Sequence, residues 1–131
     1  MNKKLFRDTK QRHAIKRALD NAGRPLGPKE ILELASKEVP NLGIATVYRN
    51  IKTMVEKGEL ATVDLPGQAP RYQPPSDRPP HLFIDEKSDS VYNIDPNLEG
   101  VVIDLPENFE LERFQIIAFG RVTKAKRKAA R

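Results

Sequence analysis

The fold of this chain is decided by residues 40–58, which read PNLGIATVYRNIKTMVEKG. Their apolar positions recur every three or four residues, which predicts a helix from about Ala45 to Lys57 with one buried face. Gly58 is suited to end this helix, and the short, glycine-containing link before it is typical of a helix-turn-helix. The buried face is expected to contain Val47, Ile51, Met54 and Val55.

The opposite face of this helix is polar and basic. Arg49 has the forked donors that fit a guanine edge or a phosphate, and Tyr48 can stack on a base or contact a thymine methyl group. Thr46 can bind a phosphate. The face is therefore a candidate DNA-reading surface, although a solvated helix surface has the same composition. Its members are Thr46, Tyr48, Arg49, Asn50 and Lys52.

Two further helices are predicted before this one. Thr9 is a suitable N-cap for a helix that runs to about Ala22, where Gly23 ends it. Pro28 suits the first position of a second helix, which ends at Pro40.

A hairpin is predicted after the third helix. Residues 59–65 contain β-branched side chains typical of a strand, and a turn at residues 66–70 leads to a partner strand at residues 71–73. Three helices followed by a hairpin are the layout of a winged helix-turn-helix. We expect this DNA-binding domain to span residues 1–75 of an α+β protein.

The second half follows a proline-rich stretch, residues 74–80, that is typical of a stiff linker. Beyond it we expect strands at residues 81–85 and 90–94, a helix from Asp95 to about Leu105, and a long strand from Phe109 to Val122. The last strand is apolar on both faces and so needs a second cover, which a dimer interface supplies. The prediction for residues 81–122 is therefore a small α/β dimerisation domain with a three-stranded antiparallel sheet.

Charge is divided unevenly along the chain, whose formal net charge is +5. Residues 1–20 hold seven basic and two acidic side chains, whereas residues 74–114 hold three basic and ten acidic ones. Residues 121–131 hold six basic side chains and no acidic one, and we expect a basic tail at residues 123–131. The basic regions favour a polyanion as the partner, although a solvated basic surface without a partner has the same charge.

The composition argues against an enzyme and against a membrane protein. The 131 residues include no cysteine and two histidines, His13 and His81, so we find no thiolate nucleophile, no cysteine zinc site and no serine–histidine–acid arrangement. No apolar run approaches the ~18 residues of a membrane span, and no apolar segment follows the basic N-terminus as in a signal peptide. We expect a cytoplasmic protein with no cofactor and no membrane partner.

Two motifs resemble the Fur family, the ferric-uptake-regulator type of bacterial metalloregulators. Residues 7–15, RDTKQRHAI, resemble the family's opening R-x-T-x-Q-R-x-x-I, and residues 43–51, GIATVYRNI, resemble its recognition helix, G-[IL]-A-T-V-Y-R-x-[IL]. The resemblance implies a dimeric winged-helix transcription factor that binds double-stranded DNA. It also implies that Tyr48 and Arg49 contact the major groove and that Arg7 lies where the family places a basic residue in the minor groove. The predicted DNA-binding residues are thus Arg7, Thr9, Arg12, Thr46, Tyr48, Arg49, Asn50 and Lys52.

The metal ligands that the resemblance implies are largely absent. The family binds metal after its wing with a run like R-Y-E-L, then H-H-H-L-I-C and a further cysteine, whereas residues 71–74 read RYQP and residues 79–84 read PPHLFI. A structural zinc needs about four ligands. His81 alone remains, as a weak candidate beside its interpretation as an ordinary strand residue, so we expect no metal site. The residues in the other ligand places are Gln73, Pro79, Pro80, Ile84 and Lys87.

The sequence thus predicts a sequence-specific DNA-binding regulator, a Fur-like repressor that acts as a homodimer without the family's metal switch. Two alternatives stay open. The chain could be a co-regulator or antirepressor that forms heterodimers with a Fur-family protein, or a sequence-independent DNA binder. The salt dependence of binding and the ratio of specific to non-specific affinity distinguish the latter from a specific regulator.

Overall fold

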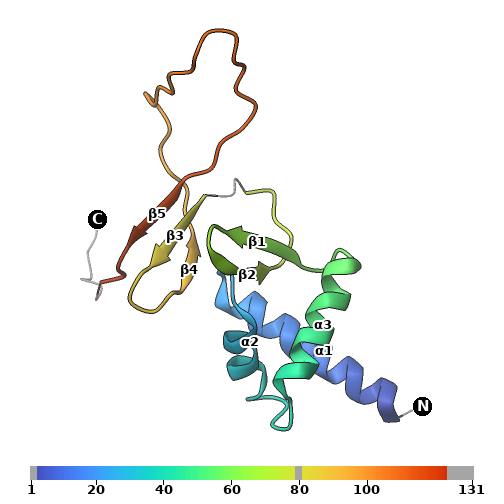
Figure 1. Ribbon diagram of the computed structural model, residues 1–131. Helices are drawn as coiled ribbons and strands as arrows, with labels where there is room; N and C mark the ends of the chain where they lie inside the picture. Colours follow the sequence, from blue (N-terminus) through green and yellow to red (C-terminus); the bar gives the residue numbers. More distant parts are fainter. Residues whose placement is uncertain (1–2, 79–80, 124–131) are drawn as a thin grey trace. The chain divides into compact units, whose positions relative to one another are not determined.

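Three helices form the first part of the chain: α1 (Lys3–Ala22), α2 (Pro28–Ala35) and α3 (Ile44–Glu56) (Figure 1). The computed structural model describes residues 3–78 and 81–123. The chain divides into two compact units, Met1–Asp77 and Arg78–Arg131, called unit 1 and unit 2 below. Among the described residues, every helix is too short or too polar to cross a bilayer. Apart from Thr123, the predicted basic tail lies outside the described residues.

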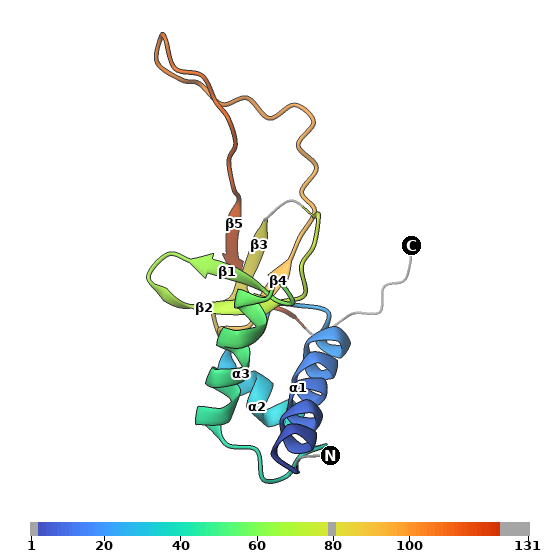
Figure 2. The same cartoon turned by 90° about the vertical axis from the view of Figure 1, so that its right-hand side faces the viewer.

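The core of unit 1 lies where the apolar stripes of the three helices meet. Figure 2 shows α1 and α3 on either side of α2, and Ile15, Leu19 and Ile31 are completely buried there. Because side chains three and four positions apart share one side of a helix, the periodicity of α3 correctly predicts its inner face. Val47, Ile51 and Met54 are buried, and Val55 packs against them.

The ends of the helices match the predictions at the glycines and at Pro28, which begins α2, and differ at the start of α1 and the end of α2. Gly23 and Gly58 have φ of +65° and +76° after α1 and α3, as expected of residues that end a helix. α1, however, begins at Lys3, so Thr9 lies inside it and is not its N-cap. The residues before Thr9 include leucine, arginine and lysines, which are good helix formers and extend the helix. α2 ends at Ala35, before the predicted end at Pro40.

The hairpin of unit 1 consists of β1 (Ala61–Leu65) and β2 (Gln68–Gln73), paired antiparallel. Its turn is tighter than predicted, because Gly67 adopts a φ of +71° and reverses the chain within Pro66–Gly67. Two backbone hydrogen bonds of 2.9 and 2.8 Å join Leu26, which lies between α1 and α2, to Tyr72. They fasten the hairpin to the helices as the wing of a winged helix-turn-helix.

Unit 2 contains a three-stranded sheet of β3 (Leu82–Asp85), β4 (Val91–Asn93) and β5 (Ile117–Gly120), in the order β4-β3-β5. β3 and β4 pair antiparallel, as predicted. β5 pairs parallel to β3, so the prediction of an entirely antiparallel sheet is wrong for this pair. The long connection from β4 allows β5 to reach the far edge of β3 and pair with it in parallel. The residue pattern of a strand does not indicate whether the strand pairs parallel or antiparallel.

The connection from β4 to β5, residues 94–116, contains no helix or strand, so the predicted helix from Asp95 to Leu105 is wrong. Gly100 adopts a φ of +84°, which cannot continue a right-handed helix. The predicted strand from Phe109 to Val122 is confirmed only at β5, because β3 offers just four residues for it to pair with.

The buried contacts of α1 predict that Leu19→Ala lowers the free energy of unfolding of unit 1 by about 2–5 kcal/mol, because it leaves a cavity in the core. Leu19 is 0% exposed. Urea unfolding of the full chain, followed by circular dichroism, measures the change. Leu5→Ala is the matched control, because Leu5 is 54% exposed and its loss should cost less than about 0.5 kcal/mol. Equal losses for the two variants would contradict this packing.

Candidate nucleic-acid interface

α3 presents a polar face to solvent while its apolar face lies in the core of unit 1. Tyr48 is 54% exposed, and Arg49 and Lys52 are also exposed. Their orientation follows from the burial of Val47 and Ile51, since each successive residue of a helix lies about 100° further around the axis. These three side chains are therefore presented to solvent together.

Asn50 and Thr46, two other predicted DNA-binding residues, lie closer to the body of the helix. The Nδ2 group of Asn50 donates a hydrogen bond of 2.9 Å to the backbone oxygen of Thr46, and only 9% of Asn50 is exposed. Asn50 therefore stabilises the first turns of α3 rather than extending toward a base. Thr46 is half-buried.

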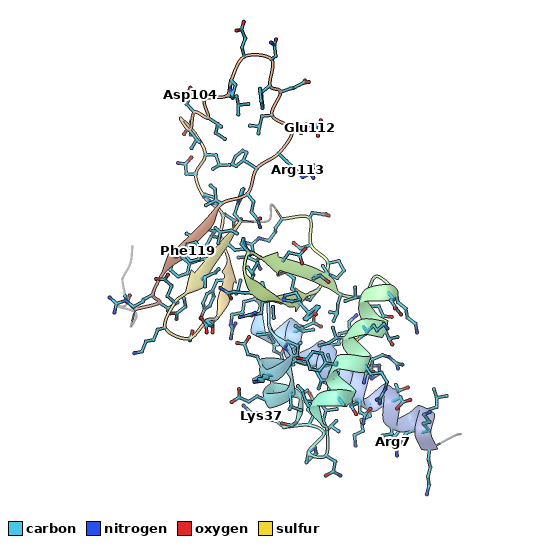
Figure 3. All side chains as sticks on the ribbon, in the orientation of Figure 1. Arg7, Lys37, Asp104, Glu112, Arg113 and Phe119 are labelled. Atoms are coloured by element: carbon cyan, nitrogen blue, oxygen red, sulfur yellow. The ribbon has the colours of Figure 1, made fainter. Side chains whose placement is uncertain are left out.

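The N-terminal half of α1 forms a second exposed basic surface. In α1, the buried residues begin at Gln11, and Arg7 extends into solvent from the turns before it (Figure 3). Thr9 and Arg12 are half-buried, and the Nη2 group of Arg12 donates a hydrogen bond of 3.4 Å to the hydroxyl of Thr9. Of the predicted α1 residues, Arg7 is thus the most accessible to a polyanion.

A hollow of ≈ 230 Å³ lies where α1 passes the end of α3. Two of its lining residues, His13 and Lys16, are absent from the predicted DNA-binding set. The signal in the sequence is the four-residue spacing from Arg12 to Lys16, which places both cations on one side of α1. Three basic side chains and one carboxylate give the hollow a net positive charge that suits a phosphate group. Its lining residues are Arg12, His13, Lys16, Met54 and Glu59.

Tyr72 lies on β2 of the wing, partly buried against the core of unit 1. Burial raises the pKa of the Tyr72 hydroxyl above its ordinary value, and neighbouring Tyr48 and Asp64 raise it further. Tyr72 packs against the core and so holds β2 to the helices.

The residues in the family's ligand places do not fit a metal. His81 is 4% exposed, and its Nδ1 atom accepts a hydrogen bond of 2.9 Å from the backbone N–H of Ile116. Its ring also lies 5.8 Å from that of Phe114. Since a nitrogen that accepts this bond has its lone pair engaged, Nδ1 is not a metal ligand. Ile84 is buried in the core of unit 2 and Lys87 is exposed.

The nearby carboxylates provide no replacement ligand set. Asp85 accepts a hydrogen bond of 2.9 Å from the backbone N–H of Lys87, which lowers the pKa of the Asp85 carboxyl below its ordinary value. This carboxylate therefore closes the turn between β3 and β4. Within residues 3–78 and 81–123, no group of three or more histidine, aspartate or glutamate side chains is arranged to hold a metal ion.

Comparisons with known proteins agree with this architecture. The sequence profile of the "Ferric uptake regulator family" matches residues 3–119. A solved "zinc-bound manganese uptake regulator" is similar, with a TM-score of 0.71 and 22% identity over 86% of this chain and 88% of that chain. At such identity the similarity shows the fold alone. A search of the curated proteins found no significant match.

Two further solved structures share the fold. The ferric uptake regulator from Francisella tularensis with iron has a TM-score of 0.63 and 18% identity over 86% of this chain and 88% of that chain. The Vibrio cholerae ferric uptake regulator has a TM-score of 0.62 and 13% identity over the same shares of the two chains.

The exposure of Arg49 predicts that Arg49→Ala costs about 1–3 kcal/mol of affinity for a selected duplex and relaxes its sequence preference, because a forked contact to a base edge is lost. Fluorescence anisotropy with a duplex selected from a random library measures both effects. Lys87→Ala is the matched control, since it removes one exposed positive charge from unit 2. If Arg49→Ala and Lys87→Ala bind alike, α3 is not the reading helix.

The exposure of Arg7 predicts a different outcome for Arg7→Ala. Loss of one phosphate contact should lower the slope of log affinity against log salt by about one unit, with little change in sequence preference. Titrations of the selected duplex at several salt concentrations give this slope. An unchanged slope would remove Arg7 from the interface, and a loss of affinity confined to A·T-rich sites would instead indicate minor-groove reading.

Proposed function

This chain belongs to the ferric uptake regulator family, and from that membership we propose that it is a sequence-specific repressor that acts without a metal switch. Members of the family are cytoplasmic, non-enzymatic regulators of transcription that bind DNA as dimers. The chain is accordingly a DNA-binding transcriptional regulator. Specificity, repression, self-association and metal independence are the proposed properties.

The observation that carries the proposal is the exposed face of α3. Tyr48, Arg49 and Lys52 point away from the core, whereas the neighbouring apolar residues hold the helix in place. A helix presented in this way fits the major groove, where a forked arginine distinguishes guanine from the other bases. Arg7 and the hollow beside Arg12 supply cations for the phosphates on either side.

Self-association is proposed because one exposed α3 face reads only a few base pairs. Two copies related by a two-fold axis read a palindromic site, whose half-site spacing mirrors the spacing of the two helices. Unit 2 is the proposed dimerisation domain, at residues 81–122, and it leaves unit 1 to bind DNA. A dimer bound over a promoter would block transcription, which is the proposed repression.

Metal independence is supported by the residues that occupy the ligand places. A ligand shifts a conformational equilibrium only by its differential affinity for the two states. His81 uses its Nδ1 atom for the backbone of Ile116, which leaves its Nε2 atom, and Asp85 closes the turn after β3, so the described residues supply no complete set of metal ligands to create such a difference in affinity. The chain would then repress constitutively, respond to another signal, or be controlled by its own abundance.

Two other functions predict different DNA binding. A co-regulator that forms heterodimers with a Fur-family protein needs no reading face of its own, and the exposed polar face of α3 therefore favours a direct DNA binder. A sequence-independent binder needs only cations, and its affinity should be the same for selected and scrambled duplexes at every salt concentration.

The proposal predicts that the affinity for a selected duplex is the same in excess chelator as in added zinc, manganese or iron. Anisotropy titrations provide the affinities, and elemental analysis of the purified dimer provides the metal content. The affinities measured in chelator and with each added metal should agree within about twofold, because under the proposal no set of ligands links metal binding to DNA binding.

His81→Ala is the control variant in this experiment, and it should be as insensitive to metal as the parent. A metal-dependent gain of about tenfold, or one metal ion per chain in the purified protein, contradicts the proposal. A gain that disappears in His81→Ala would assign the site to His81 through its Nε2 atom.

A further inference from the structure

The hollow where α1 passes the end of α3 is shaped by the way in which α3 ends. Gly58 has a φ of +76°, and its N–H donates a hydrogen bond of 3.0 Å to the backbone oxygen of Val55. The N–H of Glu59 donates one of 2.8 Å to the backbone oxygen of Met54. This pair of bonds is a Schellman motif, and it fixes the backbone of Glu59 beside Met54. Both residues line the hollow, and its other lining residues, all on α1, are Arg12, His13 and Lys16.

The basic side chains of the hollow are not neutralised by the chain itself. Among residues 3–78 and 81–123, no side chain forms an ion pair or hydrogen bond with that of His13 or Lys16. Arg17, the next residue of α1, differs because its Nε group donates to both carboxylate oxygens of Glu38, at 3.0 and 2.9 Å. Arg12 donates one long hydrogen bond of 3.4 Å to a threonine hydroxyl, which leaves most of its five donors unused. The hollow thus gathers donors that suit an anion from outside the chain.

The carboxylate of Glu59 gives the hollow a second kind of polar group. Glu59 is half-buried, and it makes no ion pair with another described residue. A backbone phosphate of DNA has no N–H or O–H group to donate to this carboxylate and is repelled by its charge. A ligand that carries an anionic group and also a hydroxyl or amino donor satisfies both sides of the hollow.

The size of the hollow limits the ligand to a small molecule. Its volume of ≈ 230 Å³ lies below the range of about 300–1,000 Å³ that is usual for pockets that bind drug-sized ligands. Met54 is 1% exposed and contributes an apolar wall, against which a short carbon chain can pack. A phosphate group that carries a few further atoms fits this space and this chemistry.

We propose that the hollow binds a small phosphate monoester that also carries a hydroxyl or amino group. The phosphate is bound by Arg12, His13 and Lys16, and the hydroxyl or amino group donates to Glu59. Because the proposed function assigns the same cations to a phosphate of DNA, the ligand competes with the duplex and releases the repressor. Ligand binding itself does not depend on the proposed function, whereas its effect on DNA affinity rests on it.

Binding is tested first in the absence of DNA, with glycerol 3-phosphate and inorganic phosphate as the probes. Proton NMR follows the ring signals of His13, one of two histidines in the chain, and His13→Gln identifies these signals by their loss. Glycerol 3-phosphate should shift them in a saturable way. The ring signals of His81, which is 4% exposed, should stay unchanged and serve as the internal reference.

Two variants test the roles of the opposed charges. Lys16→Ala should weaken the binding of both probes by about fivefold to tenfold, because a hydrogen bond to a charged group is lost. Glu59→Ala should strengthen the binding of inorganic phosphate, because a negative charge is removed, and should abolish any preference for glycerol 3-phosphate over inorganic phosphate. Lys29→Ala and Glu33→Ala are the matched controls at exposed positions of α2, and they should bind both probes as the parent does.

Three results would show that the hollow is not such a site. The first is the absence of a saturable shift of the His13 signals, and the second is an equal shift with sodium chloride at the same ionic strength. The third is equal binding by Lys16→Ala and Lys29→Ala. Circular dichroism of each variant establishes that it is folded, so that a lost shift reports on the site.

Anisotropy with the selected duplex tests the effect on DNA binding. Saturating glycerol 3-phosphate should lower the affinity for the duplex by about tenfold relative to chloride at the same ionic strength, and Lys16→Ala should lose this effect. A probe that shifts the His13 signals but leaves the duplex affinity unchanged overturns the competition. A chain that binds the probe but no duplex overturns the proposed function instead, and a chain that binds the duplex but no probe overturns this inference alone.

Discussion

The packing of the apolar face of α3 into the core that it shares with α1 and α2 is the interaction on which the rest of the structure depends. Val47, Ile51 and Met54 fix the rotation of α3 about its axis, and this rotation alone determines that Tyr48, Arg49 and Lys52 point outward. The backbone pairing of Leu26 with Tyr72 then fastens the wing to the three helices. The burial of one face of α3 and the exposure of the proposed DNA-reading face thus follow from the same helical repeat.

The sequence predicts unit 1 well because its structure is determined locally. Periodic apolar residues identify α3, and glycines such as Gly23 and Gly58 mark where helices end. The chain before Thr9 is the exception, since helix propensity there extends α1 without any contact to the core. The candidate DNA-reading residues follow from the same helical repeat of apolar residues. The hydrogen bond from Asn50 to the backbone of Thr46, however, cannot be predicted from the sequence pattern.

Unit 2 is predicted less well because its structure depends on contacts distant in sequence. The spacing of apolar residues identifies β3 and β4, but the direction of β5 depends on the path of a long connection. Gly100, with its φ of +84°, interrupts the helix that Asp95 and Pro96 favour. The engagement of His81 by the backbone of Ile116, 35 residues away, is likewise a tertiary contact, and it explains how a lone histidine is used when the other ligands are absent.

The central claim is that this chain binds a specific duplex as a dimer without metal. The most direct measurement is the ratio of affinities for a selected and a scrambled duplex, at fixed salt and in excess chelator, with the stoichiometry obtained by sedimentation velocity. We predict two chains per duplex and an affinity ratio of at least about 10³. A ratio near one in chelator, or specific binding that requires added metal, would contradict it.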